Sequence, residues 1–181
     1  MPSISGTLAV EQRVINKKGG YEAGINTSGY LKIKLNESAG AMSSLYINLY
    51  SSYQHDEYII SGYNYASTKH WDSPKVTLRS SNKDAKTVYF GYDGDNDLWV
   101  AIPHGSYHNV SVSDAANSYS NKTPINGITY TWNLSTDTTQ WATGNTVIQT
   151  TKTVYPLIDS SDLQTAVDEL NDTIGDINSV L

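Results

Sequence analysis

Three aspartates at alternate positions, Asp93, Asp95 and Asp97, are the residues of this chain that most resemble a metal site. A calcium loop places carboxylates at its first, third and fifth positions, because a hard cation binds several oxygen ligands. Such a loop also requires Gly at its sixth position and Glu at its twelfth, where this chain has Leu98 and His104. Since Asp and Gly also form turns, we predict a plain hairpin turn here, without bound metal.

The other residues that could do chemistry do not form a catalytic pattern. His104 and His108 are four residues apart, and no third ligand lies near them in the sequence, which argues against zinc. The sequence contains no Gly-x-Ser-x-Gly elbow, phosphate loop or His-Glu-x-x-His motif. No pair of carboxylates stands out as the two that a glycosidase needs. We therefore expect no enzyme activity and no cofactor.

Binding is the chemistry that the remaining residue types favour. The number of aromatic residues is larger than one strand face requires. Sugar-binding sites use the faces of aromatic rings, with hydrogen bonds from neighbouring Asn, Asp and Ser. The alternative is that the large aromatic residues Trp71 and Trp99 pack in the core or in a subunit interface. Turn residues are better candidates for an exposed contact surface, because binding residues tend to lie on loops held by a rigid scaffold. The turn candidates are Asp93, Asp95, Asn96, His104 and Tyr107.

The composition narrows the possible partners. The chain has 181 residues, of which only 17% are charged, and its net charge is −6. Nucleic acid is an unsuitable partner, because phosphate binding needs clustered Lys and Arg and the basic residues here are scattered. The sequence has no Cys, so it forms no disulfide, and no apolar run approaches the length of a membrane span.

Alternating apolar and polar residues predict the strands that would position these side chains. From Leu45 to Asp114, short alternating runs are separated by polar turns, which is typical of an antiparallel β-sandwich or meander. Further strands are expected over 4–15, 30–35, 128–134 and 146–155, and Lys17 to Gly20 is expected to break the first of them. The predicted organisation is an N-terminal β segment (1–44), a β-sandwich module (45–159) and a C-terminal helix (160–181).

The C-terminal segment changes to the spacing of a coiled coil. Apolar residues alternate four and three residues apart at Leu163, Val167, Leu170, Ile174, Ile177 and Leu181. Val167, Ile174 and Leu181 are assigned to position a of the heptad, and Leu163, Leu170 and Ile177 to position d. Leu and β-branched residues therefore occur at both kinds of position, a mixture compatible with a trimer. Ser161 with Gln164 forms a capping box that predicts the helix start. A helix this short is marginal alone, so we expect it to self-associate; the alternative is one amphipathic helix docked on its own domain.

Several collinear blocks carry a family resemblance. They are Ile60-Ser61-Gly62-Tyr63-Asn64-Tyr65, Trp71, Val88-Tyr89-Phe90-Gly91-Tyr92-Asp93-Gly94, Val110-Ser111-Val112-Ser113-Asp114 and Ser118-Tyr119-Ser120-Asn121. Their order and spacing from about Leu45 to Asn121 resemble a module in the distal part of bacteriophage tail fibres and tailspikes. The resemblance implies a parallel homotrimer in the virion tail, made in the host cytoplasm, with other tail proteins as partners.

These observations predict an all-β tail-fibre module that contributes to host-surface recognition through a bacterial glycan. Two other functions remain open. The chain could be a purely structural trimerisation or stem module, or a carbohydrate-binding module unconnected with phage.

Overall fold

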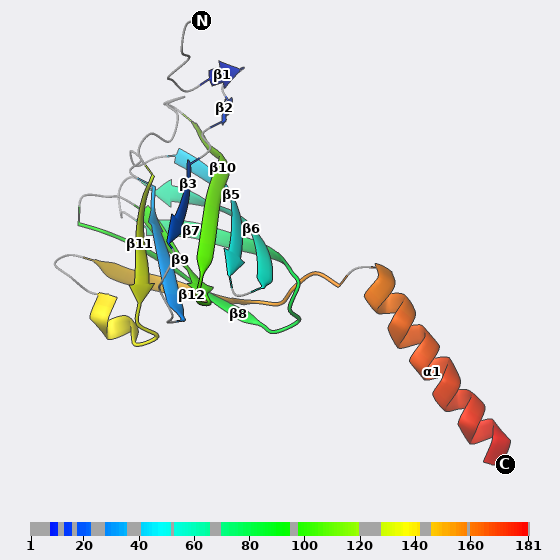
Figure 1. Cartoon of the computed structure of the whole chain (residues 1–181). Coiled ribbons are helices and arrows are strands. Elements are labelled where there is room, and N and C mark those ends of the chain that lie inside the picture. The colour runs from blue at the N-terminus through cyan, green and yellow to red at the C-terminus, as the bar shows by residue number, and fades with distance from the viewer. Residues whose placement is uncertain are drawn as a thin grey trace, which may run out of the picture.

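The computed structural model describes most of the chain, with gaps. The described residues are 8–10, 13–15, 18–22, 28–35, 41–51, 53–65, 70–94, 98–119, 128–141, 146–158 and 160–180. Within these ranges the chain forms two five-stranded antiparallel sheets, a separate two-stranded hairpin, and one α-helix, α1 (Ser160–Val180), that projects from the β body (Figure 1).

The two large sheets face one another as a β-sandwich. The first has the order β3 (Lys18–Glu22), β10 (His108–Tyr119), β5 (Ala41–Ser51), β6 (Gln54–Tyr65) and β7 (His70–Ser80). The second has the order β11 (Thr129–Leu134), β4 (Gly29–Lys34), β9 (Leu98–His104), β8 (Lys86–Tyr92) and β12 (Val147–Val154). Only β5, β6 and β7 form an uninterrupted meander. The chain then crosses to the second sheet at β8 and returns at β10, so the sandwich alternative of the prediction is the one observed.

The N-terminal third differs from the prediction. The single strand expected over 4–15 is instead a hairpin of β1 (Leu8–Val10) and β2 (Arg13–Ile15). Strand β2 ends at Ile15, before the segment from Lys17 to Gly20 that is expected to break it. Within that segment, however, Lys18 to Gly20 are not a break, because they lie in β3 and pair with β10. Strands β3 and β4 belong to the two large sheets, so most of the described part of 1–44 is built into the sandwich.

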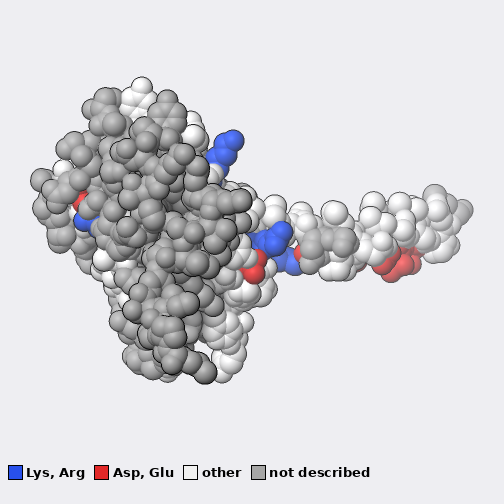
Figure 2. Space-filling model, turned by 90° about the horizontal axis from the view of Figure 1, so that it is seen from above, with Lys and Arg blue, Asp and Glu red and all other residues white. Residues whose placement is uncertain are grey.

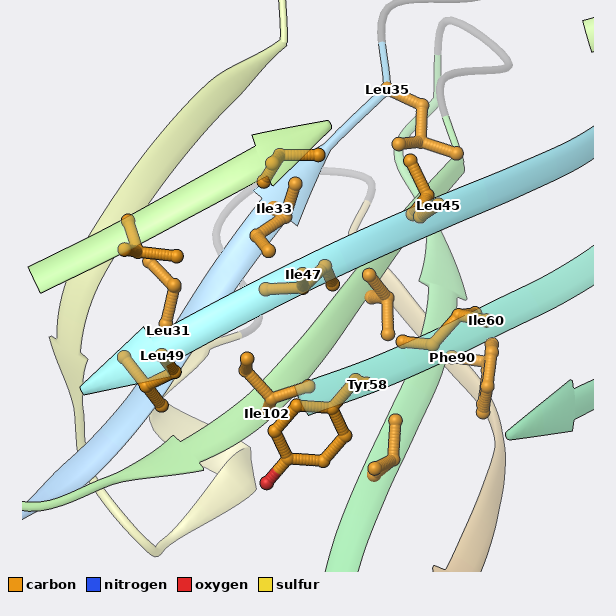
Figure 3. Packing of buried hydrophobic residues seen from close by; sticks show 14 of the residues in the cluster. Leu31, Ile33, Leu35, Leu45, Ile47, Leu49, Tyr58, Ile60, Phe90 and Ile102 are labelled. Carbon is orange, nitrogen blue, oxygen red and sulfur yellow. The ribbon is translucent and has the colours of Figure 1, made fainter. Parts of the chain in front are cut away.

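The core fills the space between the sheets (Figure 3). Its central side chains are fully buried and alternate along β4 and β5, as period-two spacing predicts. They include Leu31, Ile33, Leu45, Ile47, Leu49, Tyr58, Ile60, Phe90, Val100 and Ile102. Trp71 joins this core, packing edge-on against Phe90 and donating its indole N–H to the carbonyl oxygen of Trp99 at 3.1 Å.

Strand β9 is buried on both faces, which the sequence pattern does not predict. Alternation with Leu98, Val100 and Ile102 would place Trp99 and Ala101 on the solvent side of the sheet. Both are instead fully buried in a second cluster on the outer face of the sheet. A 3-10 turn, η1 (Thr138–Trp141), folds Trp141 over this face, where its ring lies 6.3 Å from that of Trp99. Tyr30 and Tyr89 pack against this cluster: Tyr89 makes edge-to-face contacts with Tyr30 and with Trp141, and Tyr30 makes a tilted contact with Trp141. The packing alternative for Trp71 and Trp99 is therefore confirmed.

Helix α1 begins at Ser160, within one residue of the predicted start. Ser161 lies inside the first turn and accepts a hydrogen bond from Thr165, while Gln164 donates its amide to Asp168 at 2.8 Å. The described side chains from Leu163 to Val180 are all exposed, so the helix is not docked on the sandwich. Neither α1 nor η1, the helices that the structure describes, has the length and apolarity to cross a membrane.

Candidate functional site

Three exposed tyrosines meet at one end of the sandwich. Tyr50, Tyr53 and Tyr107, with Ser106, line a shallow groove of about 300 Å³, which we call the tyrosine groove. Tyr50 is near the end of β5 and Tyr53 lies in the β5–β6 turn, and Ser106 and Tyr107 lie in the turn between β9 and β10. The exposed fractions of the three tyrosines are 49%, 95% and 51% in chain order. Of the candidates proposed from the sequence, Tyr107 is therefore on an accessible aromatic surface.

The backbone of this groove is strained at two of its tyrosines. Tyr53 has φ of 67° and Tyr107 has φ of 53°, in the left-handed region that bulky residues rarely adopt. Each such residue costs about 1–3 kcal/mol and persists only where the surrounding structure holds it. Both residues lie in tight turns, and a third described residue with positive φ, Ser73, lies outside the groove. Because such outliers are often found at functional sites, the groove is a candidate contact surface.

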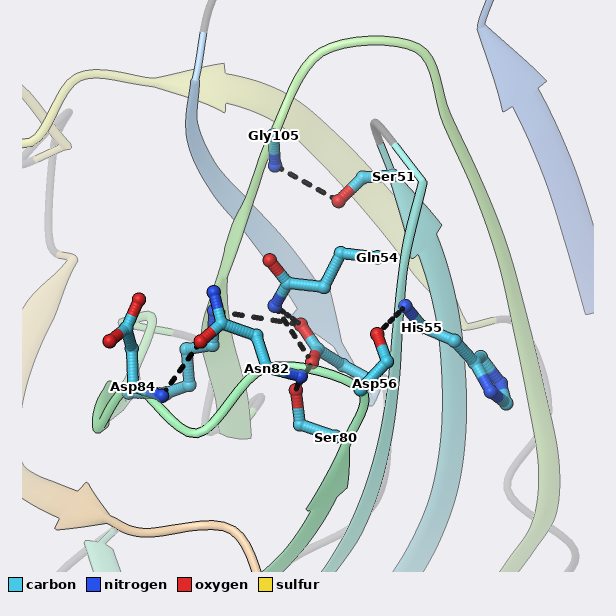
Figure 4. Close-up of polar contacts among 10 residues, drawn as sticks. Ser51, Gln54, His55, Asp56, Ser80, Asn82, Asp84 and Gly105 are labelled. Atoms are coloured by element: carbon cyan, nitrogen blue, oxygen red, sulfur yellow. Dashed lines mark hydrogen bonds and ion pairs between the residues drawn. The ribbon is translucent and has the colours of Figure 1, made fainter.

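A buried clamp at Gly105 holds the second turn in place. The Gly105 N–H donates to Ser51 Oγ at 3.1 Å, which ties the turn to the end of β5 (Figure 4). The Gly105 carbonyl oxygen lies 2.8 Å from His104 Nδ1 and 3.1 Å from His108 Nδ1. Because a carbonyl can only accept, both imidazoles carry a proton on Nδ1. The turn that presents Tyr107 is thus fixed to the hairpin that presents Tyr50 and Tyr53.

His104 belongs to this clamp and does not provide contact surface. Its side chain is 5% exposed, and His108 is fully buried. The two rings lie 4.3 Å apart, and His108 stacks on Trp132 at 3.9 Å. The prediction of His104 as an exposed turn residue is wrong. Both imidazoles donate to the Gly105 carbonyl oxygen, and this contact holds them in the interior. No group of three His, Asp or Glu side chains in the described part of the chain could hold a metal.

Asp93 lies at the opposite end of β9 and is occupied by structural contacts. Its carboxylate accepts from Lys32 Nζ at 3.1 Å and Thr146 Oγ1 at 2.9 Å, and Lys34 Nζ lies 3.2 Å away. Burial alone would raise the pKa of Asp93, but the hydrogen bonds and charges of these partners outweigh it and hold the pKa below the ordinary 3.8. The other two predicted contacts, Asp95 and Asn96, lie outside the described residues.

Replacing Asp93 by Asn is expected to destabilise the fold at neutral pH by about 1–3 kcal/mol, because two ammonium groups lose their carboxylate. The folded pKa of Asp93 is lower than the unfolded one, so its contribution is complete above the unfolded pKa and is lost as pH falls through the folded value. Urea unfolding at pH 7 and pH 3 should therefore give a difference between wild type and Asp93→Asn that shrinks in acid. Asp84→Asn, at an exposed turn residue, is the matched control. A difference of equal size at both pH values would refute this assignment.

A second polar network, missed by the sequence reasoning, links the tyrosine groove to the root of α1. Asp56 is 2% exposed and accepts from Gln54 Nε2 at 2.9 Å and from Ser80 Oγ, with Lys86 Nζ 4.0 Å away (Figure 4). Next to it, His55 N–H donates to Ser81 Oγ at 2.9 Å. The signal was present in the sequence: Asp56 is in phase with Tyr58 and Ile60, which both face the core.

The a and d side chains of α1 form a second candidate site. Those within the described residues, Leu163 to Ile177, are between 47% and 59% exposed; Leu181 lies beyond them. We call this row the seam. The helix has five acidic residues and no Lys or Arg. These acidic residues are Asp162, Asp168, Glu169, Asp172 and Asp176. All five occupy positions b, c and f, away from the seam.

The e and g positions, which flank the seam, are uncharged. They are Gln164, Ala166, Asn171, Thr173, Asn178 and Val180. In a parallel coiled coil these positions face the neighbouring helices, where like charges would repel. Figure 2 shows the helix projecting with acidic atoms along it and basic atoms only near its root. The charge pattern therefore permits copies of this helix to pack side by side.

Comparisons with protein-family models, with curated proteins and with solved structures give no match.

Proposed function

We propose that this chain is a homotrimeric module of a bacteriophage tail fibre or tailspike, and that it contributes to adsorption by binding a glycan of the bacterial surface. In this role it joins other virion tail proteins in the virion tail. The sandwich provides the glycan-contacting surface, and α1 holds three copies together.

The observation that carries the proposal is the seam of α1. A helix of 21 residues with no core behind it is marginal in water, because helices are stabilised mainly by packing of their apolar face. Its exposed apolar row and its uncharged flanks are both explained if copies of the chain cover the seam. The mixture of Leu and β-branched residues at a and d is compatible with three strands.

The tyrosine groove supports the glycan part of the proposal. Its lining side chains are three tyrosines and a serine, all uncharged, so the groove suits a neutral hydroxyl-rich ligand. A tyrosine offers an apolar ring face together with a hydroxyl that can hydrogen-bond. The Gly105 clamp fixes the two turns relative to one another. Less conformational entropy of these turns is therefore lost when a ligand binds.

The second candidate is a structural stem, for which the seam alone would suffice. A carbohydrate-binding module unconnected with phage is the third, and it would use the tyrosine groove without the seam. Solution mass and glycan binding together separate the three functions. We expect light scattering of the full chain to give three times the chain mass of 19.9 kDa, and a panel of bacterial surface polysaccharides to yield at least one ligand. A trimer without a ligand favours the stem, and a monomer with one favours the third function.

Replacing Tyr53 and Tyr107 by Asn is expected to reduce polysaccharide binding by at least tenfold each, as is common when an aromatic contact is removed. Asn tolerates the left-handed backbone better than Tyr, so the melting temperature should stay level or rise. Tyr65→Asn, at the other end of β6, is the matched control, since Tyr65 is 47% exposed. Unchanged binding in both groove variants, with binding intact in wild type, would remove the tyrosine groove as the site.

A further inference from the structure

A second groove lies between the sandwich and the root of α1. It has a volume of about 690 Å³ and is lined mainly by the linker 155–158 and the first turns of the helix. We call it the collar groove. Its linker residues Tyr155, Leu157 and Ile158 are 71%, 55% and 67% exposed, which is unusual for three large apolar side chains so close together.

Contacts on both sides of the collar groove connect its walls to the sandwich. Leu157 N–H donates to the carbonyl oxygen of Leu78 at 2.8 Å, and Pro156 forms a parallel bridge with the same residue. Across the groove, Lys83 Nζ lies 2.6 Å from Asp162 Oδ1 in the first turn of α1. The linker is therefore tied to the edge of β7, and the helix root is tied to the turn that follows β7.

The groove is continuous with the seam. Leu163, a d residue of the seam, and Ala166, a g residue that flanks it, both line the collar groove. Packed helices lie about 8–10 Å apart, and in a parallel arrangement equivalent residues share one level along the axis. A second copy seated on the seam therefore brings the first turn of its own α1, and the Ile158 that precedes it, to the mouth of the groove.

The charges around the collar groove are compatible with a second copy of the chain in it. The one acidic residue of the first two turns, Asp162, lies on the outer face at c and is already paired with Lys83. Among the described residues that line the groove, an approaching copy consequently meets Leu163 and Ala166, and the one carboxylate, that of Asp162, is already paired. An apolar linker that is exposed in the single chain is thereby covered.

From this continuity we infer that the collar groove is an interface between copies, filled by the first turn of α1 and Ile158 of a second copy. The inference rests on the proposed trimer and extends it, because the contact between copies then includes the sandwich as well as the coiled coil. The helix direction relative to each sandwich is fixed in the assembly by the same contacts.

The test uses the full chain and single charges at the collar. Ile158→Asp is expected to shift dissociation on dilution to at least tenfold higher concentration, measured by sedimentation. Val147→Asp is the matched control, since Val147 is 40% exposed on β12 outside the groove. If Ile158→Asp dissociates no more readily than wild type, the collar interface is overturned while the trimer stands. If wild type is itself monomeric, the proposed trimer fails and the inference with it.

A cross-link gives a second readout that does not depend on weakening the fold. The chain has no Cys, so a single introduced Cys reports only its own surroundings. Ile158→Cys is expected to form disulfide-linked dimers on mild oxidation. The inferred contact brings residue 158 of one copy to the groove that residue 158 of a neighbouring copy lines, so two of the three copies can be linked. Thr151→Cys, exposed on β12, should stay unlinked. Absence of linked dimers in a trimeric Ile158→Cys protein would contradict the inference.

Discussion

Replacing Leu170 by Asp converts the trimer that we propose into monomers. Leu170 is the middle d residue of the seam and is 59% exposed in the single chain. Burying a leucine contributes about 1.5–3 kcal/mol, and three copies lose that contribution together, so trimer dissociation should rise by about a thousandfold or more. Three carboxylates would also meet in one layer, without a basic residue on the helix to pair with them.

Light scattering should report the change of mass, and far-UV circular dichroism should report loss of helix, because an isolated helix of this length is marginal. Thr165→Asp adds the same charge at an f position on the outer face and is expected to leave the mass unchanged. A Leu170→Asp protein that stays trimeric would show that the seam is not the interface.

Replacing Gly91 by Ala is expected to destabilise the sandwich by at least about 3 kcal/mol, at the upper end of overpacking effects. A Cβ at this position would overlap the ring of Trp99 and the carbonyl oxygen of Val147. Neither neighbour is free to move: Trp99 is fully buried, and Val147 belongs to the ladder that pairs β12 with β8. For a chain of this size the loss corresponds to a fall in melting temperature of roughly 6–12 °C.

Gly175→Ala is the matched control for this prediction, because a Cβ there meets no atom within 4 Å. Helix propensity favours this change by about 1 kcal/mol, so the same substitution should raise the stability of α1. Thermal unfolding of the two variants beside wild type measures both effects. Equal melting temperatures for Gly91→Ala and wild type would mean that β8 and β12 do not approach as closely as the structure shows.

Sequence periodicity predicts strands well where a strand is buried on one side only. The alternation in β4 and β5 appears in the structure as buried Leu31 and Ile33, and as Leu45, Ile47 and Leu49. Alternation fails for β9, because Trp141 arrives from 42 positions further along the chain to cover Trp99. A pattern read along one strand carries no information about a cover supplied by a distant turn.

The tyrosine groove was predictable only in part, for a similar reason. Tyr107 is found from its turn, whereas Tyr50 and Tyr53 come from a hairpin more than 50 positions earlier and reach the groove through the pairing of β10 with β5. His104 misleads because a polar residue beside Gly normally indicates an exposed turn. His104 is buried because its imidazole, like that of His108, donates to the Gly105 carbonyl oxygen. That oxygen comes within hydrogen-bond distance of both rings only when the turn is folded.

The tyrosine groove and the root of α1 lie at the same end of the sandwich, joined through Gln54, Asp56 and Ser80. In the trimer that we propose, a threefold axis along α1 would place the three grooves at the same level along that axis. If one groove of the proposed trimer holds a polysaccharide on the bacterial surface, as we propose, the other two grooves are at a high effective concentration relative to that surface, and avidity can exceed single-site affinity by about 10²–10⁴. Weak binding at each groove is then compatible with firm attachment, and a soluble monosaccharide would compete poorly against a polysaccharide-coated surface.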